Sequence, residues 1–138
     1  MAKFTLDIEY DYDFNLIGLC CHARDYKICW SINNYLGFDF TRQDNLKLIT
    51  KVSTSEFSFF YYEDEDAQQE YSLISNRGTG GLLLPEQKQA DYFLKLSGPV
   101  SNKQMERLIG KLKELDIIIT AFPIEVEHLK SKQNLLLE

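Results

Sequence analysis

The sequence has no long hydrophobic run, few cysteines and fewer cations than anions, and each shortage excludes a class of protein. No apolar stretch approaches the roughly 20 residues of a membrane-spanning helix. No signal-peptide-like apolar core follows the first methionine, so we expect a cytoplasmic protein with no membrane partner. The 15 Lys and Arg against 21 Asp and Glu give a net charge of −6, which argues against nucleic-acid binding.

The cysteines and histidines are also too few, and wrongly spaced, for the common sites built from them. Three cysteines, two of them adjacent, do not suit a disulfide framework and favour reduced thiols. The two histidines and three cysteines lack the paired spacing of a zinc site. Cys21 and His22 are neighbours whose side chains point opposite ways on an extended segment, so they do not form a catalytic pair. We predict no catalytic residue, no metal and no cofactor.

The sequence does contain enough apolar material for one packed domain. Of its 138 residues, 44% are hydrophobic and 13% are aromatic, which argues against disorder. We expect a single domain over residues 1–138, with residues 123–138 as a C-terminal tail packed on it. The sequence indicates no oligomeric state.

Hydrophobic periodicity predicts two helices among several strands. One helix is expected over residues 24–36, ended by Gly37, and a second after Ser101, whose spacing to Gln104 fits a capping box. Residues 14–20 are apolar on both faces, as in a central strand. Residues 117–122 are equally apolar and are expected beside them in the centre of the sheet. Further strands are expected at 6–14, 38–41, 56–62, 71–75 and 91–96, with a strand or loop at 46–52.

This order predicts an α+β fold: a single two-layer domain with a mostly antiparallel sheet and two main helices. The arrangement is strand, helix, a meander of strands, helix, strand, similar to a ferredoxin-like plan with extra strands. The first strand alternates apolar residues with acids. The acidic row is expected to be the solvated face of an edge strand, or else a surface for a basic partner. It consists of Asp7, Glu9, Asp11 and Asp13.

The first helix is the most informative segment, because it holds the only tryptophan. Tyr26, Trp30 and Asn33 form a stripe beside its apolar face. We expect another segment of the same chain to cover Trp30, since tryptophan is usually buried. The alternative is a partner surface, because Trp and Tyr are enriched in binding hot spots. The face expected to pack on the sheet consists of Ile28, Cys29, Ile32, Tyr35 and Leu36.

The start of this helix brings three polar side chains to a strand–helix junction: His22, Arg24 and Asp25. Backbone N–H groups at a helix start attract anions, and Arg24 would add a fixed positive charge. The simpler interpretation is that Asp25 caps the helix and Arg24 is solvated.

The segment from Leu84 to Tyr92 is a second candidate site. Glu86, Asp91 and Tyr92 place two carboxylates and a phenol around a loop–strand junction, where they could bind a ligand. The alternative is a self-satisfied turn in which Asp91 accepts hydrogen bonds from local amides.

The same segment resembles the signature of the bacterial IPExxxVDY family. Leu84 stands in place of the Ile and Ala90 in place of the Val. The other four signature residues match: Pro85, Glu86, Asp91 and Tyr92. Residues 13–36 and 130–137 are also similar to that family. The resemblance implies a small cytoplasmic bacterial protein of unknown function, with no established activity, cofactor or catalytic residue.

Three functional hypotheses follow. The first is a non-enzymatic interaction or regulatory domain with an unidentified protein partner, motivated by the Tyr26/Trp30/Asn33 stripe. The second is a small-ligand (anion) binder or enzyme that uses the junction at His22–Asp25, together with Glu86 and Asp91. The third is a purely structural domain in which the chain itself covers Trp30.

Overall fold

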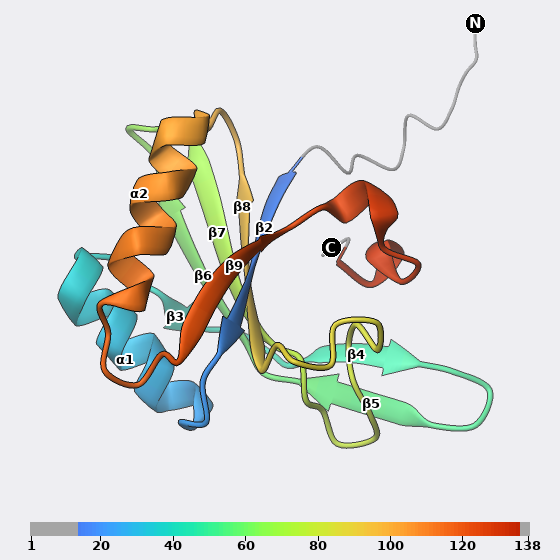
Figure 1. Cartoon of the computed structure of the whole chain (residues 1–138). Coiled ribbons are helices and arrows are strands. Elements are labelled where there is room, and N and C mark those ends of the chain that lie inside the picture. The colour runs from blue at the N-terminus through green and yellow to red at the C-terminus, as the bar shows by residue number, and fades with distance from the viewer. Residues whose placement is uncertain (1–13, 136–138) are drawn as a thin grey trace, which may run out of the picture.

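A six-stranded sheet forms the middle of the molecule (Figure 1). The computed structural model describes residues 14–135, so the strand predicted over 6–14 and its acidic row lie outside the described residues. The strand order is β3-β6-β7-β8-β2-β9, and every neighbouring pair is antiparallel. The strands are β2 (Phe14–Cys20), β3 (Thr41–Arg42), β6 (Phe59–Asp64), β7 (Gln69–Ser75), β8 (Tyr92–Ser97) and β9 (Thr120–Ile124).

Two helices, α1 (Asp25–Leu36) and α2 (Asn102–Lys113), cover one face of this sheet (Figure 1). Gly37 ends α1 with a φ of 72°, and the Ser101 hydroxyl accepts a hydrogen bond from the Gln104 N–H at the start of α2, both as predicted. The predicted α+β class, two main helices and mostly antiparallel sheet are confirmed. Strands β7, β8, β2 and β9 with the two helices form a β-α-β-β-α-β plan, which β6 and β3 extend at one edge.

The core on the helix side follows from the alternation of side chains along the strands. Every second residue of a strand points to the same face, so Ile17 and Leu19 of β2 meet the helices together with Leu94 and Leu96 of β8. The helices contribute their apolar stripes to the same cluster. Its buried helical residues are Ile28, Cys29 and Ile32 of α1 and Leu108 and Leu112 of α2.

The opposite face of the sheet is also buried, but under irregular chain and a hairpin. The hairpin of β4 (Leu46–Ile49) and β5 (Thr54–Phe57) covers part of it, with Phe57 in the cluster. The loop between β7 and β8 adds Leu83, Leu84 and Ala90, each fully buried. The C-terminal segment covers the rest through two short 3-10 helices, η2 (Val126–His128) and η3 (Lys132–Leu135). Burial on both faces explains why β2 carries apolar side chains on both of its faces.

The expected central position of residues 117–122 is wrong. Strand β9 begins only at Thr120, and it lies beside β2 at the edge of the described sheet. Residues 117–119 belong instead to the connection from α2, where Ile118 is buried and Ile119 is 64% exposed. Pro123 suits an edge strand because it has no N–H to donate to a further strand. Three successive apolar residues in a partly buried connection therefore have the same sequence pattern as a central strand.

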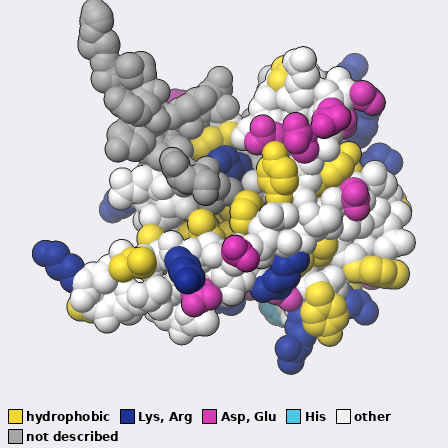
Figure 2. Space-filling model, turned by 180° about the vertical axis from the view of Figure 1, so that it is seen from behind, with side chains coloured by type: hydrophobic (Ala, Val, Ile, Leu, Met, Phe, Trp, Pro, Cys, Tyr) yellow, Lys and Arg dark blue, Asp and Glu magenta, His cyan; other side chains and the backbone are white. Residues whose placement is uncertain are grey.

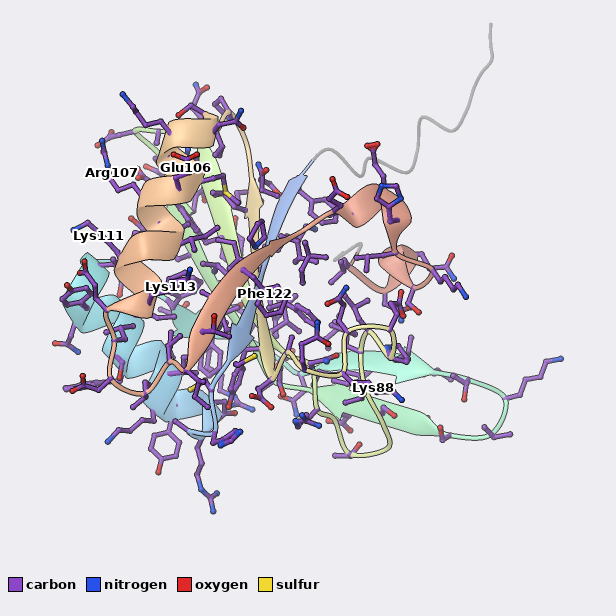
Figure 3. The ribbon with its side chains drawn as sticks, viewed as in Figure 1. Lys88, Glu106, Arg107, Lys111, Lys113 and Phe122 are labelled. Atoms are coloured by element: carbon purple, nitrogen blue, oxygen red, sulfur yellow. The ribbon has the colours of Figure 1, made fainter. Side chains whose placement is uncertain are left out.

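The boundaries of two other segments also differ from expectation. The strand expected at 38–41 begins only at Thr41, and the predicted tail starts as strand, because Pro123 lies within β9. The ring of Phe122 lies over β2 (Figure 3). A Cβ atom at Gly18 would come within 2.7 Å of that ring, which explains a glycine in the middle of a buried strand. No helix among residues 14–135 is long and apolar enough to cross a membrane.

Candidate functional site

The segment from Leu84 to Tyr92 is held in place by Asn76, which is fully buried at the end of β7. The side-chain amide of Asn76 donates to the carbonyls of Gln87 and Ala90, at 2.9 and 2.8 Å. Its side-chain oxygen accepts from the N–H of Leu84 at 2.8 Å. One side chain thus supplies three of the hydrogen bonds that this buried loop backbone needs.

Asp91 and Tyr92 tie the end of the loop to the junction between β2 and α1. One Asp91 carboxylate oxygen accepts from the Cys21 N–H, and the other accepts from Arg77 Nε, both at 2.8 Å. The Tyr92 hydroxyl donates to the Ala23 carbonyl at 2.6 Å. Burial, with a smaller effect of nearby Cys21, raises the pKa of Tyr92, so the phenol stays protonated and keeps donating at neutral pH. Both side chains act inside the fold.

Glu86 lies elsewhere and contacts the C-terminal segment. Its carboxylate accepts from the Ser131 N–H at 2.7 Å. Partial burial raises the pKa of Glu86, but the hydrogen bonds from Ser131 outweigh that effect and the net pKa is lowered. The Glu86 carboxylate therefore fastens the C-terminal segment rather than pointing into a groove shared with Asp91.

The strand–helix junction opens onto a polar groove of about 440 Å³. Arg24 and Asp25 line it, together with Arg42 and Arg77. Arg42 Nη1 lies 2.8 Å from Asp25 Oδ2. Burial raises the pKa of Asp25. The hydrogen bonds from Arg42 and from the Tyr26 N–H together lower this pKa by more, so the net shift is downward. The expectation that Asp25 caps α1 is wrong, because Arg24 occupies the N-cap position and Asp25 is the first residue of the helix.

His22 and Asp91 line a smaller neighbouring groove of about 240 Å³, and Tyr92 and Arg77 line both grooves. The fold therefore brings His22, Arg24 and Asp25 near Asp91 and Tyr92, and it leaves Glu86 out. Two of the three arginines in this region already pair with a carboxylate. Among residues 14–135, no three His, Cys, Asp or Glu side chains lie together as a metal site.

The predicted stripe on α1 separates into two parts. Asn33 turns inward, where its Oδ1 accepts from the Phe40 N–H at 2.9 Å and its Nδ2 donates to the Phe40 carbonyl at 3.1 Å. Asn33 thus holds the chain after α1. Tyr35, expected in the core, is instead 48% exposed, and its hydroxyl donates to Glu114 at the end of α2. Tyr35 lies at the margin of the apolar stripe, and its polar end reaches solvent and Glu114.

Trp30 is not covered by the chain. Its side chain is 63% exposed, and Tyr26, one helical turn earlier, is 64% exposed. The expected intramolecular cover is therefore wrong. Figure 2 shows large hydrophobic side chains standing out at the lower right, where α1 lies. No residue of the segment from Leu84 to Tyr92 lines the groove beside Trp30.

A groove of about 430 Å³ runs beside Trp30, between α1 and the connection after α2. We call its apolar part the Trp30 surface and define it as Trp30, Tyr35, Leu115 and Ile117. Lys27 and Asp116 lie at the same groove and supply one charge of each sign. Leu115 and Ile117 also pack against the core, so one wall of the groove is fixed.

Comparisons with known proteins do not name the site. Neither the family models nor the curated proteins include a match to this chain. The resemblance to the IPExxxVDY family therefore stays a prediction.

Sequence reasoning missed Asn76, Arg42 and Arg77. Asn76 and Arg77 stand side by side in a glycine-rich stretch, and Arg42 stands in a segment without a motif. Arg42 pairs with Asp25, Arg77 with Asp91 and Asn76 with the Leu84 N–H, which lie 17, 14 and 8 positions away along the chain. Only the folded chain therefore shows these pairings.

Proposed function

We propose that this protein is a non-enzymatic binding module that docks a protein partner on the Trp30 surface. The observation that carries the proposal is the 63% exposure of the only tryptophan in the chain, beside a groove with a fixed apolar wall. Indole rings give large contact areas at a small loss of conformational entropy, and they dominate many interfaces.

The free energy that covering Trp30 would supply supports a docking role for this side chain over a neutral one. Covering the exposed part of an indole would remove roughly 150 Å² of largely apolar surface from water, or about 4 kcal/mol before the losses of association. Tyr35 adds to the same patch. A folded chain gains nothing from leaving this surface in water, whereas an interface gains from it.

The partner chemistry follows from the lining. Apolar walls around Trp30 and Ile117 suit a protruding aliphatic or aromatic side chain. Lys27 and Asp116 offer a partner one cation and one anion at the rim, where charges set orientation and association rate more than affinity. We therefore expect the partner to present an apolar anchor flanked by polar residues.

The cysteines give little support to an enzymatic alternative. Burial raises the pKa of the thiols of Cys20, Cys21 and Cys29. They are therefore protonated at neutral pH, and a thiol is a much weaker nucleophile than a thiolate.

The test uses a photo-crosslinking amino acid at Lys27, which lines the groove. The matched control carries it at Lys51, an exposed lysine in the β4–β5 turn. We expect the Lys27 variant, in cells that express the protein natively, to capture a protein that the Lys51 variant does not. The purified candidate should then shift the fluorescence of Trp30 in the wild-type protein to shorter wavelength.

A substitution then measures the contribution of the indole. Trp30→Ala should weaken the purified complex at least about 30-fold, the usual effect of a hot-spot residue. Val52→Ala, which truncates an even more exposed apolar side chain (92%) in the turn of the β4–β5 hairpin, should leave the affinity unchanged. Equal affinities for wild type and Trp30→Ala, with both proteins folded by circular dichroism, would refute the proposal.

A further inference from the structure

A second groove lies between α2 and the β6–β7 hairpin, and no residue lines both it and the groove of the Trp30 surface. Its volume is about 480 Å³, within the range of roughly 300–1,000 Å³ that is usual for small-molecule sites. Lys103, Arg107 and Lys111 line the wall formed by α2, and Asp64 lines the opposite wall. One wall is therefore cationic and the other carries an acid.

The three cations share one side of α2 because they are spaced four residues apart. In Figure 3, Arg107 and Lys111 leave the helix on the same side, whereas Glu106 and Lys113 project elsewhere. All three are exposed, and none forms a hydrogen bond or ion pair through its side chain with a residue among 14–135. Like charges four residues apart repel each other and destabilise a helix. A bound anion would relieve that repulsion.

The floor of the groove is aromatic and rigid. The Phe38 ring centroid lies 4.8 Å from that of Tyr71 and 4.9 Å from that of Tyr62. The Tyr71 hydroxyl donates to Gln69 Oε1 at 2.9 Å, and Gln69 Nε2 donates to the Pro99 carbonyl at 2.8 Å. Burial, with Asp64 and Tyr62 nearby, raises the pKa of Tyr71 to about 12, so this network persists at neutral pH. The floor is formed before any ligand arrives.

We propose that this groove binds a small organic anion with an apolar, ring-containing body. The body lies on the Phe38 side of the floor. A carboxylate, sulfonate or phosphate group meets Arg107, whose fork can hold two oxygens, and Lys111, which adds a point charge. Asp64 on the opposite wall repels the anionic group and so fixes the orientation of the ligand.

The acids of the hairpin also decide against an acidic polypeptide as the occupant. Figure 2 shows acidic side chains in a row across the upper right of the molecule, where the β6–β7 hairpin lies. An acidic chain laid along α2 would face Asp64 across the groove, beside the other acids of this hairpin, and would be repelled. A compact ligand with one anionic end avoids the hairpin. The acids of this hairpin include Glu63, Asp64, Glu65 and Asp66, of which Asp64 lines the groove.

The probe for the test is anilinonaphthalene sulfonate, a fluorescent aromatic anion. Titration of the folded wild-type protein should give saturable fluorescence, and amide shifts in NMR spectra should cluster at Phe38, Tyr71 and Gln104. Arg107→Gln and Lys111→Gln should each weaken binding by about fivefold, the effect of losing one exposed charge pair. Arg107→Lys should restore part of the loss.

The matched controls are Lys113→Gln, on another side of the same helix, and Lys88→Gln, in the loop before β8; both should bind as wild type (Figure 3). Neutral anilinonaphthalene should bind more weakly than the sulfonate, and inorganic phosphate alone should compete poorly. The inference is overturned if the four glutamine variants all bind the probe equally, or if the amide shifts fall outside this groove. If Trp30→Ala were the only variant that lost binding of the probe, this inference would also be overturned. That result would not contradict the proposed partner site on the Trp30 surface.

Discussion

The segment from Leu84 to Tyr92 and the outer face of α1 both contain candidate site residues in the sequence, but their side chains have opposite environments in the fold. In the first, Glu86, Asp91 and Tyr92 each have a partner within the chain. In the second, Trp30 stands 63% exposed. A side chain whose bonding capacity is met inside the molecule stabilises the fold, whereas one left unmet is available to something outside.

The difference also explains the signature-like residues without any ligand. Leu84 and Ala90 are fully buried under the sheet, and Asp91 and Tyr92 join the loop to the β2–α1 junction. Each of these residues matches its tertiary environment, so their role in folding accounts for their presence in this chain. Substitutions in the segment should therefore change stability, and substitutions on the Trp30 surface should not.

Within the segment from Leu84 to Tyr92, the largest effect on stability is expected for Asp91→Ala. The change leaves the buried Cys21 N–H without an acceptor and Arg77 without its carboxylate. We expect the free energy of unfolding to fall by about 2–3 kcal/mol, measured by urea denaturation. Glu65→Ala, an exposed acid in the β6–β7 turn, is the control and should change it by less than about 0.5 kcal/mol. A small loss of unfolding free energy for Asp91→Ala would show that its hydrogen bonds with Cys21 and Arg77 are dispensable for the fold.

Tyr92→Phe should have a smaller effect of about 1 kcal/mol. The substitution keeps the buried ring and removes only the hydroxyl that donates to the Ala23 carbonyl. Thermal and urea unfolding of the variant measure this single bond. No measurable change would mean that water replaces the hydroxyl and that the junction does not depend on Tyr92.

Glu86→Gln should have a still smaller, pH-dependent effect. The folded-state pKa of Glu86 is lowered, so its carboxylate contributes stability above the unfolded pKa and loses it as the pH falls through the folded pKa. The variant should thus be less stable than wild type at pH 7, and the difference should shrink toward about pH 3. Urea unfolding of both proteins at the two pH values tests the sign, and a gap that widens in acid would contradict it.

Local signals allowed much of the fold to be predicted, because they act within a few residues. The apolar stripe and Gly37 define α1, and the Ser101 cap defines the start of α2. The prediction failed where distant segments decide the outcome. Residues 117–119 resemble a strand by composition. In the structure they form part of the connection between α2 and β9, and Ile118 joins the hydrophobic core.

The candidate site was predictable only in part for the same reason. The sequence made Trp30 a candidate, but whether the chain covers its side chain depends on the path of distant loops. Likewise, no local pattern links Arg77 to Asp91 or Asn76 to Ala90, because each pair meets only after β7 and β8 have paired. Residues that meet only through strand pairing have no characteristic spacing along the sequence.

The smallest effect on stability is expected for Trp30→Ala, and it sharpens the comparison most. Because the indole is mostly in water, its removal should change the free energy of unfolding by less than about 0.5 kcal/mol in urea. Ile28→Ala, two residues earlier and fully buried in the same helix, is the control and should lose about 2–5 kcal/mol. If Trp30→Ala destabilised the protein as strongly as Ile28→Ala, the indole would be part of the fold, and its exposure could no longer support a docking role.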